Sequence, residues 1–200
     1  MTETPTKIKR LKSNVQDYHD VEWLDTKGIN PIIDNATNRF VQTLNNQFRL
    51  IIAGSGSLEH ELRNMTIEYG VQNRIHFLGA VPYDMMPSLL QASNCVVLLS
   101  SAEGTPRILL EALACGKPII ASNVGGIAEM FSNNSAIGER VMEITPENIS
   151  KAIHRTFRIE QDSELKMERA LLRRNFINTR YSLKILQKKF LNYIKDVEKR

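Results

Sequence analysis

The sequence has few cysteines and lacks any long apolar run. Of its 200 residues only Cys95 and Cys115 are cysteines, and neither belongs to a C-x-x-C pair. This excludes a disulfide scaffold and favours a reducing compartment, so we expect a cytoplasmic protein. No stretch approaches the ~20 apolar residues that span a bilayer. The first ten residues contain no apolar core, which excludes a secretory signal there.

Histidine is also scarce, and positive charge is unevenly distributed. The four histidines are not spaced as metal ligands, so we expect no metal site. Residues 151–200 hold 14 Lys and Arg against 6 Asp and Glu, whereas residues 51–150 hold 5 against 10. The basic segment fits a nucleic-acid surface, an anionic membrane surface or a solvated helix face, and we favour the last. The acidic middle and the lack of aromatics interleaved with the basic residues argue against nucleic acid.

Composition and length are those of an ordinary globular chain. Hydrophobic residues make up 42% and charged residues 24% of the sequence, which excludes a disordered or fibrous protein. Two hundred residues suffice for one domain, or one domain with an appendage. We expect residues 1–20 to be a tail or linker and residues 21–200 to form the domain, with residues 145–200 as its C-terminal helices.

From residue 49 onward, short apolar runs alternate with segments of helical periodicity. This alternation predicts βαβ units, and hence an α/β, Rossmann-like, doubly wound parallel sheet with helices on both faces. Strands are predicted near 21–24, 49–53, 74–78, 95–100, 118–121 and, weakly, 136–143. Helices are predicted near 31–44, 58–69, 84–92, 108–113 and 127–131, with three more from Thr145 to the C-terminus.

Three loops follow predicted strands and combine small residues with a following helix. They are residues 54–57, 100–106 and 123–126. In an open parallel sheet such loops border the ligand crevice, and the amides at a helix N-terminus favour phosphate. Gly54-Ser-Gly56 is not a full dinucleotide fingerprint, so we favour a simple tight turn over a direct ligand contact there.

Glu103 lies in the loop of residues 100–106, and Glu111 lies in the helix predicted to follow that loop. Their spacing can bring two carboxylates to one pocket rim, where they would accept hydrogen bonds from sugar hydroxyls. The alternative is one solvated loop acid and one acid that complements the helix dipole. Spacing alone does not separate these interpretations.

Several spaced blocks resemble retaining glycosyltransferases of family 4, specifically their C-terminal, nucleotide-sugar-binding half. The signature is Glu103-Gly-Thr-Pro-Arg-Ile-Leu-Leu-Glu-Ala112, followed by Ala114-Cys-Gly-Lys-Pro-Ile-Ile-Ala-Ser122 and Val124-Gly-Gly126 with Glu129. Ile51–Gly56, Arg74–Gly79 and Ala92–Ser100 match the family's other motifs in order. The resemblance covers about residues 27–195 and implies one half of a GT-B fold with a helical C-terminal extension.

The resemblance implies a role for each matching residue. Glu103 would contact the transferred hexosyl group and act as the catalytic residue, while Glu111 would hold the ribose. The amides around Pro106–Ile108 would face the diphosphate, and Val81 would lie near the base. The resemblance implies a nucleotide diphosphate sugar as donor substrate and no essential divalent ion. The full set of donor-binding residues is Lys27, Gly104, Thr105, Pro106, Arg107, Ile108, Glu111 and Val81.

The sequence departs from the family pattern at two points. The family places an Arg at the end of its first strand and a Lys about five residues later. Lys27 matches the Lys, but Trp23 or Leu24 stands where the Arg is expected. An acceptor-binding domain of ~150 residues has no counterpart upstream of residue 21, so we expect it to be supplied in cis or trans and this half alone to be inactive.

Two further interpretations stay open beside the donor-binding one. A degenerate, non-catalytic domain could serve as a nucleotide-sugar sensor or a protein-interaction module. The basic C-terminal helices could also make peripheral membrane contact, since many family members act on lipid-linked acceptors. Their cations are Arg169, Arg173, Arg174, Arg180, Lys184, Lys188, Lys189 and Lys195.

Overall fold

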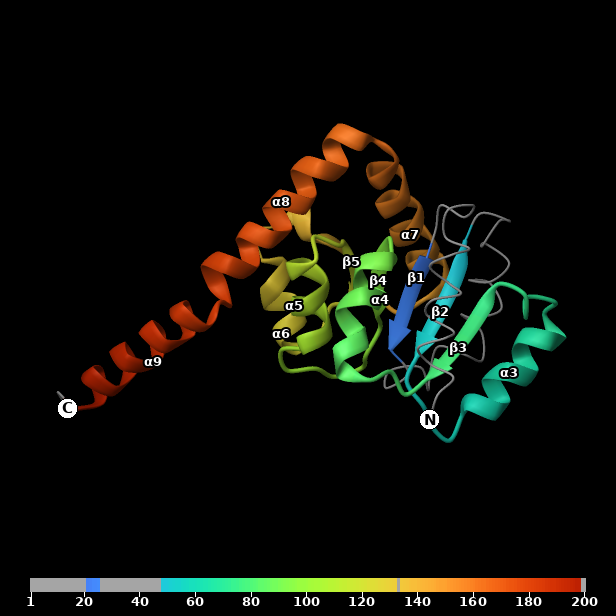
Figure 1. Ribbon diagram of the computed structural model, residues 1–200, viewed down its shortest axis with the longest axis horizontal. Coiled ribbons are helices and arrows are strands. Elements are labelled where there is room, and N and C mark those ends of the chain that lie inside the picture. Colours follow the sequence, from blue (N-terminus) through green and yellow to red (C-terminus); the bar gives the residue numbers. More distant parts are fainter. Residues whose placement is uncertain (1–20, 26–47, 133, 199–200) are drawn as a thin grey trace.

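The structure is a computed structural model that describes residues 21–25, 48–132 and 134–198. The predicted tail at 1–20 and the predicted helix at 31–44 lie outside these residues. The described helices and strands alternate along the chain as the sequence predicts (Figure 1).

The described strands form one parallel sheet of six, in the order β3-β2-β1-β4-β5-β6. This is the strand order of a doubly wound Rossmann-like sheet, so the predicted fold class is confirmed. The strands are β1 (Val21–Asp25), β2 (Arg49–Ala53), β3 (Ile75–Gly79), β4 (Cys95–Leu98), β5 (Ile119–Ser122) and β6 (Gly138–Val141).

The helices follow the strands closely, and several predicted boundaries are confirmed. Gly70 adopts φ +68° just after the helix it was predicted to end, and the Thr145 hydroxyl accepts a hydrogen bond from the Asn148 amide at 3.3 Å as an N-cap. The α-helices are α3 (Glu59–Glu68), α4 (Met86–Ala92), α5 (Arg107–Ala114), α6 (Gly125–Phe131), α7 (Pro146–Gln161), α8 (Ser163–Arg180) and α9 (Leu183–Glu198). Short 3-10 turns are η3 (Tyr83–Met85) and η4 (Ser135–Ile137).

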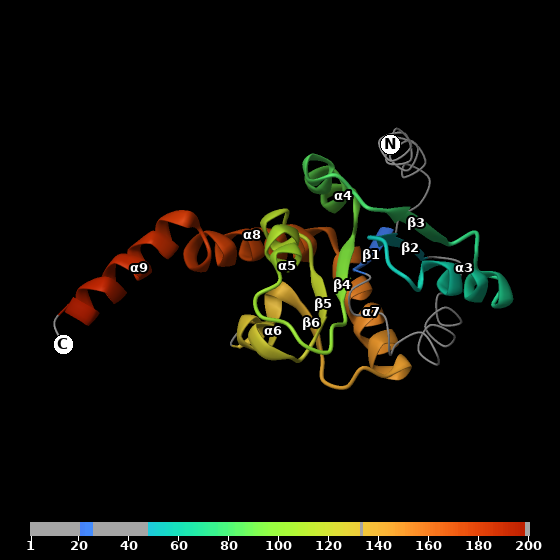
Figure 2. The same cartoon turned by 90° about the horizontal axis from the view of Figure 1, so that it is seen from below.

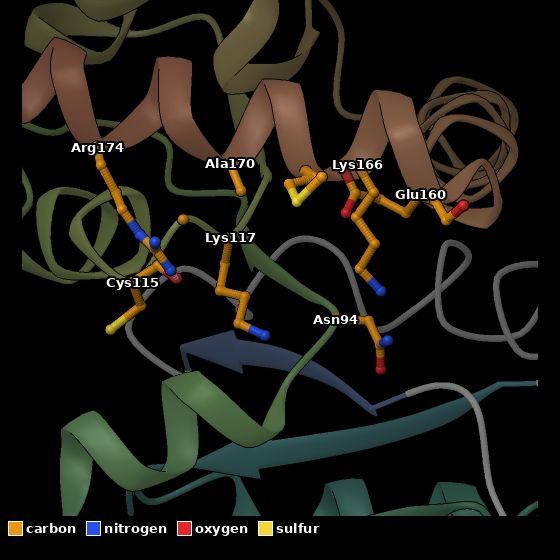
Figure 3. A pocket seen from close by; sticks show the side chains of 10 residues that line it. Asn94, Cys115, Lys117, Glu160, Lys166, Ala170 and Arg174 are labelled. Carbon is orange, nitrogen blue, oxygen red and sulfur yellow. Dashed lines mark hydrogen bonds between the residues drawn. The ribbon is translucent and has the colours of Figure 1, made fainter.

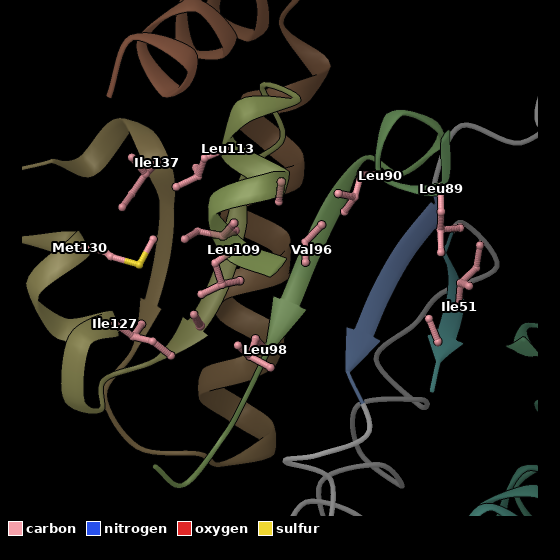
Figure 4. Close-up of a cluster of buried hydrophobic side chains, with 14 of the residues drawn as sticks. Ile51, Leu89, Leu90, Val96, Leu98, Leu109, Leu113, Ile127, Met130 and Ile137 are labelled. Carbon is pink, nitrogen blue, oxygen red and sulfur yellow. The ribbon is translucent and has the colours of Figure 1, made fainter. Parts of the chain in front are cut away.

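The sheet divides the core into two clusters because successive strand residues point to opposite faces. Leu50, Ile52 and Val97 face one cluster, which α3 and α7 cover. Ile51 and Val96 face the other, which α4, α5, α6 and α8 cover (Figure 4). Figure 2 shows the helices on both sides of the sheet. Burial on both faces explains why the β2 and β4 sequences are continuously apolar rather than alternating.

The three C-terminal helices are present, but the prediction that all their basic residues lie on an exposed face is wrong for Arg173. α8 packs against α5, and Arg173 on α8 is only 1% exposed, so it does not belong to a solvated or membrane-facing basic surface. Its guanidinium donates to the carbonyl oxygens of Gly116 and Ala136 at 3.1 and 3.0 Å and to Glu160 Oε1 at 2.8 Å. Arg173 lies one helical turn before the buried Phe176, which places it on the inner face of α8.

α9 extends away from the sheet beyond α8 (Figure 1), and its apolar stripe is exposed. The stripe consists of apolar residues at helical spacing, namely Leu183, Leu186, Phe190, Tyr193 and Ile194. Within the described residues, no helix combines the length and the apolar character needed to cross a bilayer.

Candidate functional site

The strand order marks one point on the sheet where connections run in opposite directions. β1 pairs with β2 on one side and with β4 on the other. In open parallel sheets, ligands bind in the crevice outside the carboxyl ends of such a strand pair. The β4–α5 loop, residues 99–106, borders this crevice, whereas the chain after β1 lies outside the described residues.

Glu103 is held within this loop by two serines. The Ser100 hydroxyl donates to Glu103 Oε1 at 2.8 Å, and the Ser122 hydroxyl at the end of β5 donates to the Ser100 carbonyl oxygen at 2.6 Å. Both serines are buried and Glu103 is half-buried. The carboxylate is therefore oriented by the fold while part of it stays accessible to a ligand.

Gly125 and Gly126 press directly against the backbone of the β4–α5 loop. A Cβ on Gly125 would overlap the Glu103 carbonyl oxygen, and a Cβ on Gly126 would overlap that of Gly104. The Gly126 amide donates to the Glu103 carbonyl oxygen at 3.3 Å. The turn at 123–126 was predicted to border the ligand crevice. In the structure it positions the loop that carries Glu103.

The N-terminus of α5 offers backbone donors at the same edge. Pro106 precedes the helix in an extended conformation, no side chain caps this end, and its first turn holds no acidic residue. The Arg107 and Ile108 amides are first-turn groups without an intrahelical acceptor. Together with the positive end of the helix dipole they favour an anion such as phosphate. Gly104 and Thr105, just before this turn, are exposed.

Glu111 is the fifth residue of α5, on the face turned away from the buried Leu109, Ala112 and Leu113. It therefore lies beyond the first turn, where an acid complements the helix dipole most strongly. Helical side chains lean toward the N-terminus, so Glu111 extends toward the turn of Arg107 and Ile108. Among the described residues its carboxylate has no ion pair or hydrogen-bond partner.

The loops after β2 and β3 meet at this edge as well. The Gly54 amide donates to the Gly79 carbonyl oxygen at 2.8 Å, and both glycines have positive φ. Val81, predicted to lie near a base, is half-buried and packs on the core cluster beneath α4 and α5. The Gly54 turn therefore has a structural role in joining the two loops.

Two predictions concern residues that the structure does not describe or does not group. Lys27 lies outside the described residues. β1 runs from Val21 to Asp25 and contains no Arg, so the sequence departure from the family pattern falls within a regular strand. Within the described ranges, no group of three or more His, Cys, Asp or Glu side chains is arranged to hold a metal ion.

No sequence motif predicted a cavity at the opposite, amino-terminal edge of the sheet. This cavity of about 320 Å³ lies beside Lys117, between the α5–β5 turn and α8. Lys117 belongs to the Ala114–Ser122 block of the family resemblance, and the cations that line the cavity with it come from α8, which is distant in sequence.

The profile of the family described as "Glycosyl transferases group 1" matches residues 23–173. The chain belongs to this glycosyltransferase family. An uncharacterized glycosyltransferase of Methanocaldococcus jannaschii is 33% identical over 107 residues, which cover 54% of this chain and 27% of that protein. This chain spans about a third or less of the length of such curated relatives.

Solved structures establish the fold of this family member. A glycosyltransferase from Rickettsia africae superposes with a TM-score of 0.76 at 19% identity, covering 96% of this chain and 52% of that one. Anabaena HepE in complex with UDP and glucose gives a TM-score of 0.72 at 19% identity, covering 96% and 53%. The domain is thus a C-terminal domain of the GT-B glycosyltransferase fold, as expected, while membership in family 4 stays a prediction.

Proposed function

We propose that this domain binds a nucleotide diphosphate sugar at the carboxyl edge of its sheet and acts as the donor half of a retaining glycosyltransferase. The observation that carries the proposal is the β4–α5 segment at the switch in strand order. There, a half-buried carboxylate oriented by Ser100 is followed by an uncapped helix N-terminus. Recognition of such a donor needs a carboxylate that accepts hydrogen bonds from the sugar hydroxyls and backbone amides that donate to the diphosphate.

Uridine diphosphate is the first nucleotide to test. HepE, whose fold this domain shares, has been solved in complex with UDP and with UDP-glucose. In the proposed arrangement Glu111 holds the ribose, the Arg107 and Ile108 amides face the diphosphate, and Glu103 contacts the hexosyl group. Val81 and the neighbouring backbone border the base.

The chemistry proposed is transfer with retention of configuration. The bond between the anomeric carbon and the diphosphate oxygen breaks, and a bond to the acceptor oxygen forms on the same face of the sugar. The acceptor's proton passes to the departing phosphate, so no protein base is required. The α5 amides, with Lys27 as a proposed cation, stabilise the negative charge that develops on the leaving group.

The acceptor is proposed to bind a second domain across the cleft. This chain spans about half of the Rickettsia glycosyltransferase and of HepE, so the residues that recognise the acceptor are assigned to the remaining half. The isolated domain is then expected to bind donor without transferring sugar.

A non-catalytic sensor is the second candidate, favoured by the absence of Arg from β1. One cation fewer at the diphosphate weakens donor binding by about 1.5–3 kcal/mol if the family arrangement holds. A sensor would bind nucleotide sugar yet stay inactive when an acceptor-binding domain is supplied. Measurable hydrolysis or transfer in that complemented state would exclude it.

Calorimetric titration with UDP, GDP and ADP tests the proposal. We expect one nucleotide to bind, and Glu111→Ala to weaken that binding at least about tenfold, since a charge-assisted hydrogen bond contributes about 1.5–3 kcal/mol. Glu61→Ala is the matched control, because Glu61 is an exposed acid on α3. Binding that is unchanged in Glu111→Ala would refute the ribose assignment, and no binding of any nucleotide would refute the donor site.

A further inference from the structure

A second cavity at the amino-terminal edge of the sheet gathers positive charge. Asn94 lies just before β4 and Lys117 just before β5, so this cavity is on the opposite edge from Glu103, which follows β4. Figure 3 shows side chains from α8 and from the α5–β5 turn converging on it. We call it the amino-edge cavity; the lining residues that decide its chemistry are Lys117, Glu160, Lys166, Met167, Ala170 and Arg174.

Three cations and a single carboxylate line the amino-edge cavity. The cations are Lys117 from the α5–β5 turn and Lys166 and Arg174 from α8, two helical turns apart. The carboxylate, Glu160, already accepts a hydrogen bond from the buried Arg173 at 2.8 Å. The lining therefore carries more positive than negative side chains.

Lys117 is the cation of this cavity for which the lack of a partner costs the most free energy. It is half-buried, and among the described residues its ammonium makes no ion pair or side-chain hydrogen bond. Burial lowers the pKa of Lys117, and the like charge of Lys166 lowers it further. A desolvated ammonium without a partner is costly, and an anion in the cavity would compensate this cost.

Arg174 retains most of its donors for a ligand. One guanidinium nitrogen lies 3.5 Å from the Cys115 carbonyl oxygen, a long contact at the limit of a hydrogen bond. The rest of its planar fork suits the paired oxygens of phosphate or carboxylate. Three converging cations favour a dianion over a monoanion, because each additional negative charge interacts with all three.

The remaining lining is apolar or neutral. Met167 and Ala170 form part of the α8 wall, opposite the turn that carries Lys117. A volume of about 320 Å³ is at the small end of ligand-binding cavities and exceeds what a single phosphate fills. The geometry points to a binding site for the phosphomonoester group of a small organic molecule, independent of the proposed donor site and beyond the proposed function.

The test must separate this site from any phosphate binding at α5. We would titrate isotopically labelled chain with inorganic phosphate and with glycerol 3-phosphate at constant ionic strength, using glycerol as the uncharged control. The amide resonances of Gly116 and Ala170 report on the amino-edge cavity, and those of Gly104 and Ile108 report on the other edge. We expect saturable shifts at Gly116 and Ala170, with glycerol 3-phosphate binding more tightly than phosphate alone.

Two variants and one control make the assignment. Lys117→Met should weaken binding at least about tenfold, as expected for a buried charge-assisted contact, and the exposed Lys166→Gln should weaken it about threefold. Lys151→Met removes an exposed lysine of α7 outside the cavity and should bind as the parent does. Lys166→Gln keeps the test valid if Lys117→Met fails to fold.

Three results would overturn the inference. The first is absence of saturable shifts at Gly116 and Ala170 with either phosphate probe. The second is affinity in Lys117→Met and Lys166→Gln equal to that of the parent. The third is a response confined to Gly104 and Ile108, which would assign the phosphate to the α5 N-terminus. UDP binding that survives in Lys117→Met supports the independence of the two sites, whereas its loss together with phosphate binding would refute that independence.

Discussion

Gly126 meets the Gly104 carbonyl oxygen so closely that no side chain fits between them. We expect Gly126→Ala to lower the free energy of unfolding by about 1–3 kcal/mol, because the β4–α5 loop must shift to admit the methyl group. Urea denaturation measures the change. Gly56→Ala is the control, since a Cβ there meets open space, and it should stay within about 0.5 kcal/mol of the parent. Equal stability of the two variants would contradict the close packing.

His76 on β3 makes stability depend on pH. Burial, and to a smaller extent the positive charge of Arg49, lower the pKa of His76 from its usual 6.5. The ring nitrogen Nε2 lies 3.3 Å from Arg49 Nη1 and, as a neutral imidazole, can accept its hydrogen bond. Because the unfolded chain binds this proton more readily, the contribution of His76 is complete above the unfolded pKa and decreases as pH falls through it.

His76→Gln should therefore reduce the loss of unfolding free energy between about pH 7.5 and about pH 5.5. Urea midpoints at the two pH values measure this slope. His60→Gln, which removes an exposed histidine from α3, controls for the loss of an imidazole elsewhere. A slope unchanged in His76→Gln would show that His76 is not the responsible group.

Single residues also show where sequence reasoning succeeds and where it stops. Glu103 and Glu111 could be assigned to a loop and the following helix because strand, glycine and proline signals bracket them. The Ser100 hydrogen bond to Glu103 could not be predicted, since it depends on how the loop folds back on itself. Arg173 was wrongly assigned to the exposed basic face. The sequence of a basic helix does not indicate which of its arginines will donate to carbonyl oxygens of other elements.

Among the elements, α8 is attached to the rest of the domain by apolar packing of Phe176 and by the hydrogen bonds of one buried arginine. Arg173 connects α8 to α7 through Glu160, to the α5–β5 turn through Gly116 and to η4 through Ala136. Arg173→Met should cost about 3–5 kcal/mol of unfolding free energy, since it leaves a buried carboxylate and two carbonyl oxygens without their donor.

Arg155→Met is the matched comparison for this ion pair. Arg155 pairs with Glu139 at 3.0 Å, but its side chain is 56% exposed. Exposed pairs contribute about 0–1 kcal/mol, so this variant should unfold close to the parent in urea. If the two arginine variants lose similar stability, the buried network does not anchor α8.

At the scale of the whole molecule, α9 contributes little to the folded domain. Its large apolar residues, among them Leu183, Phe190 and Leu191, are exposed and bury no described core. Removing residues 183–200 should change the unfolding free energy by less than about 1 kcal/mol. Removing residues 163–200 should instead abolish cooperative unfolding, because Phe176 and Arg173 leave with α8. A large loss from the shorter truncation would show that α9 is part of the core.

The overall topology was the most predictable level of this protein. Alternating apolar runs and helical segments required parallel strands joined by crossovers, and the strands that the structure describes follow that pattern. The amino-edge cavity was not predictable, because Lys117, Lys166 and Arg174 line one cavity only after α8 packs against α5. Local patterns determine helices and strands, whereas sites built from segments distant in sequence depend on how those elements pack.

The turn at 123–126 and the β4–α5 loop are in direct backbone contact, Gly125 with Glu103 and Gly126 with Gly104. The two loops must therefore be exchanged together in any chimera. Suppose that residues 100–106 were replaced by the corresponding segment of a relative, in an attempt to alter which sugar is recognised. The new backbone would then contact a turn at 123–126 that packs closely only against the original one. The turn at 123–126 must accompany the new segment, so the module to exchange at this edge of the sheet is a pair of loops that residues 107–122 separate in the sequence.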